Sequence, residues 1–462
     1  MSRRKRICYN CTGENYLKEF VRIHGKAIKC SYCKEKQLSI LIEKLAYKIE
    51  YGFTQFYERS ANEPSSLEYR LMSDKESRFS WERHGDPIIQ VLMDVAEIDE
   101  EIASDIQGIL EEKNSDYESA EIGLETEFST DSYYQSKILE DESWQGEWAE
   151  FEKKLKNEAR HFNQFGIKLL DRIFEGIETL ETEDGNTLVT VIGPKNPIHT
   201  LYRARVFHTD RKLQEALTNP DQQLGPPPKM HALAGRMNAR GISMFYGAIK
   251  KETAIGEVRP PVGSKVVVSK FTVLKELKLL NLNALKNVSS RGSIFNPDFI
   301  KIAKRDIFLR RLSARMSTPV MPDDEPMDYL ITQAIADYLA VESEQQFDGI
   351  LYPSVQSDNK GINVVLFNKS SRVSPYLWNL DVSLNSYTDE GWVYDYQIRK
   401  KGRKKKAVER KYYDDFLNEN VEIPIDKDKR EFTLSVDISE IWIHHVSEVQ
   451  FFTKSHDIYI YK

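Results

Sequence analysis

Beyond residue 33 the sequence contains no cysteine, and nowhere does it contain an apolar run long enough to cross a membrane. A disulfide framework is therefore excluded for most of the 462 residues. Because there is no uninterrupted apolar stretch of about 18 residues, and no apolar leader after MSRRKR, we expect a soluble, unsecreted, cytoplasmic protein without a membrane partner. The net charge of −7 argues against the whole molecule binding a polyanion.

The sequence also lacks an internal repeat and a regular βαβ rhythm, which disfavours a doubly wound parallel sheet. From residue 188 onward, strand-like runs alternate irregularly with short helical patterns, so we expect an α+β fold. The segment 329–340 (YLITQAIADYLA) predicts an amphipathic helix. The strand-like runs are LVTVI (188–192), LYRARVF (201–207), ISMFYGAI (242–249), KVVVSKFTVL (265–274), LKLLNL (277–282), INVVLF (362–367), FTLSVDI (432–438) and DIYIYK (457–462).

All the cysteines lie in two C-x-x-C pairs, Cys8 with Cys11 and Cys30 with Cys33. Two such pairs separated by 18 residues predict a tetrahedral zinc centre, because each pair presents two thiolates to one ion. Four thiolates complete the coordination shell, so the predicted zinc is structural. The alternatives are two disulfides, which a cytosolic location disfavours, or four free thiols.

The segment between the cysteines and residue 185 predicts mainly helices. Apolar stripes with helical spacing run through residues 38–49, 91–109 and 148–177, and acids greatly outnumber bases between residues 94 and 142. We therefore expect three domains: a zinc-binding knuckle (1–37), a helical accessory domain with an acidic connection (38–185) and an α+β catalytic domain (190–462).

One segment of the third domain combines residues that suit a phosphate-bearing ligand. Residues 235–261 (GRMNARGISMFYGAIKKETAIGEVRPP) hold four glycines, three arginines, Tyr246 and Glu257. Glycine allows close approach of the backbone, and the arginine fork fits phosphate. Upstream, Arg203 and Arg205 alternate in a strand-like run, and we expect one of them to face inward and the other outward.

Several separated motifs in this half resemble the RES family. They are LYRAR (201–205), LGPPPKM (224–230), GRMN (235–238), TQAIADYL (332–339), FDGILYPS (347–354), GINVVLFN (361–368) and the C-terminal VSEVQFFTKSHDIYIYK, expected to form the last strands. The resemblance extends from about residue 195 to the C-terminus. The zinc pairs and helical region are similar to the N-terminal extension of longer members. Met237 departs from the family pattern, which has an aromatic residue there.

The resemblance implies a fold similar to that of ADP-ribosyltransferase toxins and an enzyme that acts on NAD. It also implies a growth-arresting toxin of a toxin–antitoxin pair or a phage-defence effector, with an antitoxin partner and a homo-oligomer left open. The family's four catalytic positions fall on Arg203, Tyr246, Glu257 and Ser354. Positions expected to bind NAD are Arg205, Gly235, Arg236, Asn238 and Asn363.

The chemistry of NAD is consistent with these residues. Its pyrophosphate suits Arg203 or Arg236, and a carboxylate such as Glu257 stabilises the positive charge that develops on the ribose when nicotinamide leaves. Ser354 lacks a G-x-S-x-G context, so we expect it to bind and not to act as an acyl-enzyme nucleophile. Taken alone, Glu257 would be an ordinary surface acid paired with Lys251 or Arg259.

Other functions remain open from the sequence. A protein ADP-ribosyltransferase would use the same residues, with a protein side chain as acceptor. Arg78 and His84 have the spacing of HEPN ribonucleases, but Gly85-Asp86-Pro87 interrupts a helix there. The basic run Arg399–Lys406 suits a nucleic acid, although such runs are usually solvated loops, so we expect no nucleic-acid partner.

Overall fold

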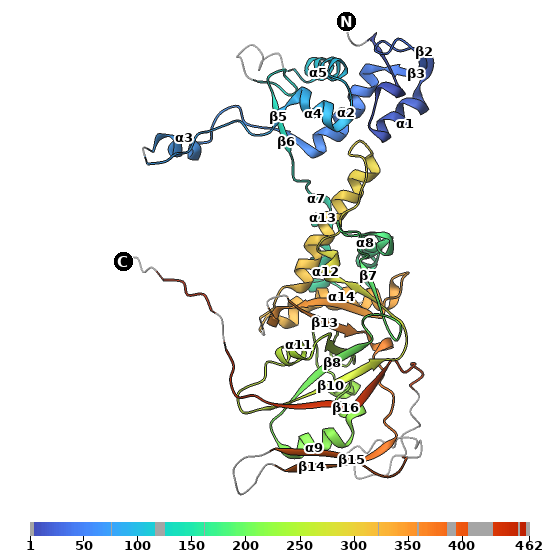
Figure 1. Ribbon diagram of the computed structural model, residues 1–462, viewed down its shortest axis with the longest axis vertical. Helices are drawn as coiled ribbons and strands as arrows, with labels where there is room; N and C mark the ends of the chain where they lie inside the picture. The colour runs from blue at the N-terminus through green and yellow to red at the C-terminus, as the bar shows by residue number, and fades with distance from the viewer. Residues whose placement is uncertain are drawn as a thin grey trace. The chain divides into compact units, whose positions relative to one another are not determined.

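The computed structural model of the chain describes residues 4–74, 76–115, 125–160, 162–321, 323–357, 360–385, 394–404, 428–450 and 453–458 (Figure 1). Its contacts divide it into two compact units. The first unit consists of Met1–Trp144 and Ser289–Phe308, and the second of Gln145–Val288 and Leu309–Lys462. The three domains expected from the sequence, 1–37, 38–185 and 190–462, stay a prediction.

The first unit contains two small antiparallel sheets and several amphipathic helices. The sheets have the strand orders β1-β3-β2 and β4-β6-β5. The second sheet was not predicted, because its strands have only two to four residues. The elements are β1 (Arg6–Cys8), α1 (Asn15–His24), β2 (Lys26–Lys29), β3 (Lys36–Leu41), α2 (Ile42–Phe56), β4 (Tyr57–Arg59), α3 (Ser66–Ser73), β5 (Asp86–Pro87), α4 (Ile88–Ala96), α5 (Glu100–Asn114) and β6 (Tyr133–Ser136).

One apolar core holds the first unit together. Leu45, Ile49 and Phe53 lie on one face of α2 at helical spacing and are fully buried. They pack with apolar residues of α1, α4 and α5 and with Phe295 from the returning segment. The helical stripes predicted from the sequence therefore form this core. Part of the acidic connection, residues 116–124, lies outside the described residues.

The second unit contains the larger sheet and most of the remaining helices. Two long helices, α7 and α13, each have residues in both units. The elements are α7 (Glu142–Asn157), α8 (Gln164–Phe174), β7 (Val189–Ile192), β8 (Thr200–Phe207), α9 (Asp210–Thr218), α10 (Pro220–Gln223), β9 (Phe245–Ala248), α11 (Lys251–Glu257), β10 (Lys265–Val273), β11 (Leu277–Asn281), α12 (Leu282–Leu285), α13 (Pro297–Ser317), α14 (Glu325–Asp337), β12 (Gly349–Ser354), β13 (Gly361–Leu366), β14 (Trp378–Asn385), β15 (Asp395–Lys404) and β16 (Leu434–His445).

The eight-stranded sheet has the order β16-β10-β8-β9-β13-β12-β11-β7. Only the β11–β12 pair is parallel, and the other neighbouring pairs are antiparallel. One face packs on α9 and the hairpin β14–β15, which lie side by side in Figure 1. The other face packs on α11 through Ala254 and Ile255. A mixed sheet covered on both faces confirms the predicted α+β class.

The C-terminal part of the second unit differs from the sequence prediction. The last described strand, β16, ends at His445, and residues 446–450 and 453–458 form no strand. The rest of the predicted C-terminal strands, residues 451–452 and 459–462, lies outside the described residues. The hairpin β14–β15 was missed, and the basic run Arg399–Lys406 lies at the end of β15, with Lys405 and Lys406 outside the described residues. In the part of the chain that the structure describes, no helix combines the length and hydropathy needed to span a bilayer.

Gly349 in β12 tests the packing of the sheet. A Cβ atom there would lie 2.1 Å from the carbonyl oxygen of Val365 and 2.9 Å from the Leu279 side chain. We expect Gly349→Ala to destabilise the protein by about 1–3 kcal/mol, because neighbouring strands have to move apart. Urea unfolding followed by circular dichroism measures this change.

The matched control is Gly146→Ala on α7, where no atom lies within 4 Å of the added Cβ. That change should stabilise the helix by roughly 0.5–1 kcal/mol, because alanine favours the helical backbone. Equal midpoints for both variants would show that the close packing at Gly349 does not exist.

Candidate functional site

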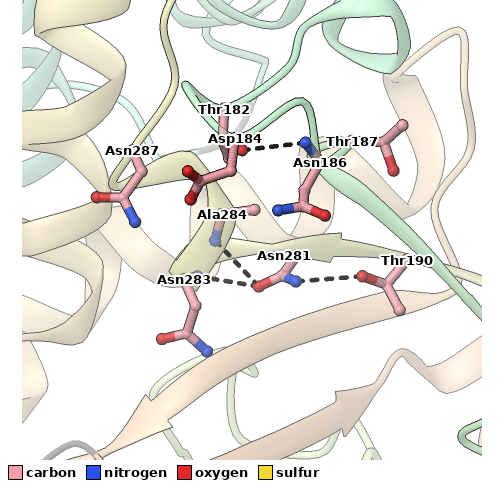
Figure 2. Close-up of a pocket in the computed structure, with 9 residues that line it drawn as sticks. All are labelled: Thr182, Asp184, Asn186, Thr187, Thr190, Asn281, Asn283, Ala284 and Asn287. Carbon is pink, nitrogen blue, oxygen red and sulfur yellow. Dashed lines mark hydrogen bonds between the residues drawn. The ribbon is translucent and has the colours of Figure 1, made fainter.

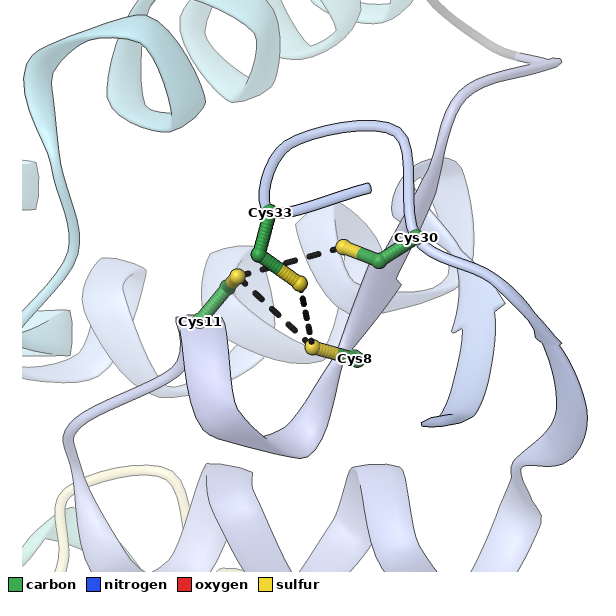
Figure 3. A group of neighbouring side chains, drawn as sticks. All are labelled: Cys8, Cys11, Cys30 and Cys33. Atoms are coloured by element: carbon green, nitrogen blue, oxygen red, sulfur yellow. Dashed lines mark hydrogen bonds between the residues drawn. The ribbon is translucent and has the colours of Figure 1, made fainter. Parts of the chain in front are cut away.

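The four cysteines converge in the first unit, as Figure 3 shows. Cys8 and Cys11 lie at the end of β1 and in the turn after it, and Cys30 and Cys33 lie in the turn between β2 and β3. The Sγ atom of Cys8 is 3.6 Å from those of Cys11 and Cys33, and Cys11 Sγ is 3.9 Å from Cys30 Sγ. All four sulfur atoms lie within 4.8 Å of one another.

These distances are compatible with a structural zinc ion. Four sulfur atoms placed about 2.3 Å from zinc at the corners of a tetrahedron are about 3.8 Å apart. The cysteines form no disulfide. Backbone N–H groups of Asn10 and Cys11 face the sulfur of Cys8, and those of Tyr32 and Cys33 face the sulfur of Cys30. The donor set therefore fits zinc and leaves no coordination position for a substrate.

A second group of polar side chains surrounds Glu257, the last residue of α11. Its Oε1 atom accepts hydrogen bonds from Ser354 Oγ at 2.5 Å and from Asn363 Nδ2 at 2.8 Å. Ser354 is 0% and Asn363 2% exposed, whereas Glu257 is exposed. One carboxylate oxygen is thus attached to the sheet, and the carboxylate reaches solvent.

The register of two strands brings these residues together. In the antiparallel pair β12–β13, Tyr352 lies opposite Asn363 and Ser354 lies opposite Gly361. Tyr352 and Ser354 are two residues apart and therefore share a face of the sheet with Asn363. This is the face that α11 covers, so the helix end carries Glu257 directly above the two strands.

Arg203 lies where strands β8 and β9 move apart. Strands β8 and β9 pair only through Tyr202 and Ala248. The Arg203 Nη1 atom donates to the carbonyl of Tyr246 at 2.7 Å, and its guanidinium lies 5.5 Å from the centre of the Phe245 ring. Burial, and to a lesser degree Arg205, lowers the pKa of Arg203 to about 10, which leaves it protonated at neutral pH. Arg203 makes no hydrogen bond to Glu257.

The expectation that Arg203 and Arg205 face opposite sides was wrong. Residues two apart in a strand point to the same face, here the face that packs on α9 and α10. Arg205 Nη1 donates to the carbonyl of Gln223 in α10. The structure therefore does not bring Arg205 to the Glu257 group, and its contact with the ligand stays a prediction.

The GRMN motif forms a turn that Asn238 and Tyr246 hold from inside. Gly235 and Asn238 exchange backbone hydrogen bonds of 2.9 and 3.3 Å. The Asn238 side chain donates to three main-chain carbonyls of the same loop and accepts from the Tyr246 hydroxyl at 2.7 Å. The hydroxyl also accepts from the backbone N–H of Met237 at 3.1 Å, and burial raises the pKa of this phenol. Tyr246 and Asn238 thus use their polar groups to shape the loop.

Arg236 extends from this turn toward the end of α13. Its Nη1 atom donates to the carbonyls of Met316 and Thr318 at 2.8 and 2.9 Å. The loop is held from the other side by α14, the helix predicted from TQAIADYL, because Gln333 Nε2 donates to the Gly235 carbonyl at 2.8 Å. Arg236 is therefore fixed through one nitrogen, and its remaining nitrogens have no partner among the described residues.

Sequence reasoning missed Tyr352. It is half-buried beside Asn363, and burial together with Tyr246 and Glu257 raises the pKa of its phenol. The phenol therefore lies close enough to Tyr246 and Glu257 to interact with them electrostatically. The signal was present in FDGILYPS, because a residue two positions before Ser354 in a strand lies on the same face.

A polar hollow of the second unit lies elsewhere, between β7, β11 and α12 (Figure 2). It has a volume of about 380 Å³ and is lined by asparagines, threonines, one aspartate and one alanine. None of the predicted site residues lines it, and it offers no cation for a phosphate. We therefore place the candidate site at Glu257 and not in this hollow.

The ribonuclease alternative finds no support. Residues 77–84, which contain Arg78 and His84, form no helix, and both side chains are exposed. The arginine with structural contacts is the neighbouring Arg83, which forms an ion pair of 2.8 Å with Glu125. A paired arginine and histidine on one helix face is thus absent from this described segment.

The cysteine cluster predicts one bound zinc per chain. We expect Cys8→Ser and Cys30→Ser to lose the metal and to lower the melting temperature, since the small sheet β1-β3-β2 depends on the centre. His24→Ala is the control: this histidine lies on α1 and contacts the Phe20 carbonyl, so it should retain the metal. Elemental analysis of the purified proteins measures the zinc. A metal-free wild type that melts as a folded protein would contradict the assignment.

Comparison with known proteins identifies one domain in this chain. Residues 200–378 match the family model of the RES domain. No curated protein and no solved structure matched the chain. The matched range begins with β8 and includes α11, α14, β12 and β13, so it contains every residue around Glu257 described above. Residues 200–378 of this protein therefore form a RES domain, and this segment of the chain belongs to the RES family.

Proposed function

We propose that this protein consumes NAD by cleaving the bond between nicotinamide and ribose. The observation that carries the proposal is the arrangement of Glu257, whose carboxylate is exposed while one of its oxygens is held by Ser354 and Asn363. The RES domain supports NAD as the substrate, because that family is associated with NAD-related activity.

The proposed reaction needs a fixed negative charge beside a sugar. When nicotinamide leaves, positive charge develops on the ribose, as in the hydrolysis of a glycoside. A carboxylate already oriented beside the sugar stabilises that charge without reorganising during the reaction. Glu257 meets this requirement because the residue is exposed and both contacts, to Ser354 and to Asn363, use the same oxygen, Oε1.

Ser354 and Asn363 orient the carboxylate in this proposal. Asn363 also has an unused acceptor, since its Oδ1 atom is buried and makes no hydrogen bond among the described residues. A buried acceptor without a donor is costly, and a ligand that donates to it recovers that cost. The carboxamide of nicotinamide or a hydroxyl of the ribose carries a suitable donor.

The remaining predicted residues support the site in different ways. Gly235, Asn238 and Tyr246 maintain the shape of the loop, and Arg203 supports the backbone of Tyr246. A direct contact of Arg203 with NAD stays a prediction.

The acceptor of ADP-ribose and the biological role rest on the family. Water, phosphate and a protein side chain all fit an exposed carboxylate, which corresponds to a glycohydrolase, a phosphorylase and an ADP-ribosyltransferase. Consumption of NAD would arrest growth, in line with a toxin controlled by an antitoxin or with a phage-defence effector in the cytoplasm. The cysteine cluster, with structural zinc, takes no part in the reaction.

Glu257→Gln is the first test. The change keeps the size of the side chain and removes its charge, so nicotinamide release should fall by about a hundredfold or more. Purified full-length protein is mixed with NAD, and nicotinamide and ADP-ribose are separated by chromatography. Glu252→Gln is the control, because that exposed residue lies on the same helix and contacts none of the site residues. Full activity of Glu257→Gln would end the proposal.

Substitutions of Tyr352 distinguish a role for its ring from a role for its hydroxyl. If the ring packs against the nicotinamide or ribose beside Asn363, Tyr352→Phe should keep KM within about threefold of the wild type. Tyr352→Ala should then raise KM for NAD by up to about tenfold. Steady-state kinetics measures both values, and a large loss of kcat in Tyr352→Phe would assign the function to the hydroxyl instead.

A further inference from the structure

One further cationic side chain lies close in sequence to the candidate carboxylate. Arg259 follows Glu257 by two residues, and its side chain is exposed. Its backbone has a φ of 43°, in the left-handed region that arginine seldom adopts. Residues held in such conformations cluster at ligand-binding sites, where the surrounding structure maintains them.

Gln356 orients the guanidinium of Arg259. With the amide oxygen of Gln356 facing the arginine, it accepts from Arg259 Nε at 3.2 Å and from Nη2 at 2.9 Å. Gln356 lies two residues after Ser354, in the turn that packs on α11. The Nη1 atom of Arg259 has no partner in the described part of the chain, so the guanidinium is fixed on one side and open on the other.

Arg236 provides a second guanidinium, from the GRMN turn. Its central carbon lies 5.9 Å from the centre of the Tyr329 ring, and the Tyr329 hydroxyl donates to Glu325 at 3.1 Å. Burial and Glu325 raise the pKa of Tyr329, whereas Arg236 and Arg259 both oppose that rise. The two guanidinium groups come from separate loops, and each retains nitrogen donors without a partner in the described part of the chain.

We propose that Arg236 and Arg259 form a clamp for the diphosphate of a dinucleotide. Each arginine offers planar donors, which suit the oxygens of a phosphate group, and two fixed guanidinium groups suit two linked phosphates. In NAD one methylene group joins the diphosphate to the nicotinamide ribose. The groups that bind the diphosphate therefore have to lie near the carboxylate that acts on that ribose. Arg259 follows Glu257 by two residues and is held by Gln356, which follows Ser354 by two residues.

The clamp deepens the proposed function and rests on it for the identity of the dinucleotide. It also changes part of the assignment made from the sequence, which gave the pyrophosphate to Arg203 or Arg236. Arg203 and Arg205 occupy the face of the sheet that packs on α9 and α10, whereas Glu257 lies over the opposite face. Arg236, the other arginine expected to bind the pyrophosphate, keeps that role and gains Arg259 as its partner.

The test uses full-length wild type, Arg259→Ala and Arg240→Ala. Arg240 is exposed in the same loop as Arg236 and has no contact with the site, so it serves as the matched control. Binding of ADP, which carries the diphosphate without nicotinamide, is measured by calorimetry. Loss of a charge-assisted hydrogen bond should weaken ADP binding by about tenfold to a hundredfold in Arg259→Ala and leave it unchanged in Arg240→Ala.

Kinetics with two substrates completes the experiment. Arg259→Ala should raise KM for NAD, while cleavage of nicotinamide riboside, which has no phosphate, should not change. Unaltered ADP affinity in Arg259→Ala, or no ADP binding by the wild type, would overturn the clamp even if NAD is cleaved. Conversely, ADP binding that depends on Arg259 in a protein that leaves NAD intact would retain the clamp and refute the proposed reaction.

Discussion

The candidate site depends on two polar side chains that are buried in a sheet and need a partner. Ser354 and Asn363 lie on neighbouring strands with almost no exposed surface, and an unpaired polar group in such a position is costly. The carboxylate at the end of α11 accepts one hydrogen bond from each, while Asn363 Oδ1 stays unpaired among the described residues. This contact attaches the helix end to the sheet and at the same time fixes the direction of Glu257. The same hydrogen bonds therefore orient the proposed reactive group and stabilise the fold.

The polar groups around that contact hold the neighbouring loops in place. Tyr246 and Asn238 use their side chains to hold the GRMN turn, and α14 holds the same turn from outside. Arg236 is then presented from a rigid loop and Arg259 from the residues that follow Glu257. Residues on rigid supports keep their geometry before a ligand arrives, which is the condition for electrostatic stabilisation of a transition state.

Much of the fold was predictable from local patterns. The strands β7 to β11 and β13 follow β-branched and aromatic runs, and the two C-x-x-C pairs predicted the cluster, because each of these signals is contained in a short stretch of sequence. Features that depend on pairing were not predictable to the same extent. The separation of β8 from β9 and the final length of β16 are set by tertiary contacts between distant segments, so the strand predictions failed for residues 446–450 and 453–458. Hairpin β14–β15 was missed because its basic strand resembles a solvated loop.

The site residues divide in the same way. Glu257, Ser354 and Asn363 were named from motifs, and the structure joins them by hydrogen bonds. Arg205 was misplaced, because the residues two apart were assigned to opposite faces. Tyr352 and Arg259 were overlooked because their significance comes from neighbours on other strands and loops: Asn363 lies opposite Tyr352, and Gln356 holds Arg259.

The single pairing between β8 and β9 also has a consequence for the dynamics of the backbone. Strand β8 pairs with β10 along its whole length but with β9 only at Tyr202. Successive N–H groups of a strand point alternately to its two neighbours. The hydrogen–deuterium exchange rate should therefore alternate between successive amides of β8. Exchange should be slow at the amides directed to β10, and faster at those directed to β9 beyond the paired residue. Such an alternation would locate the separation between β8 and β9, and the measurement needs no ligand.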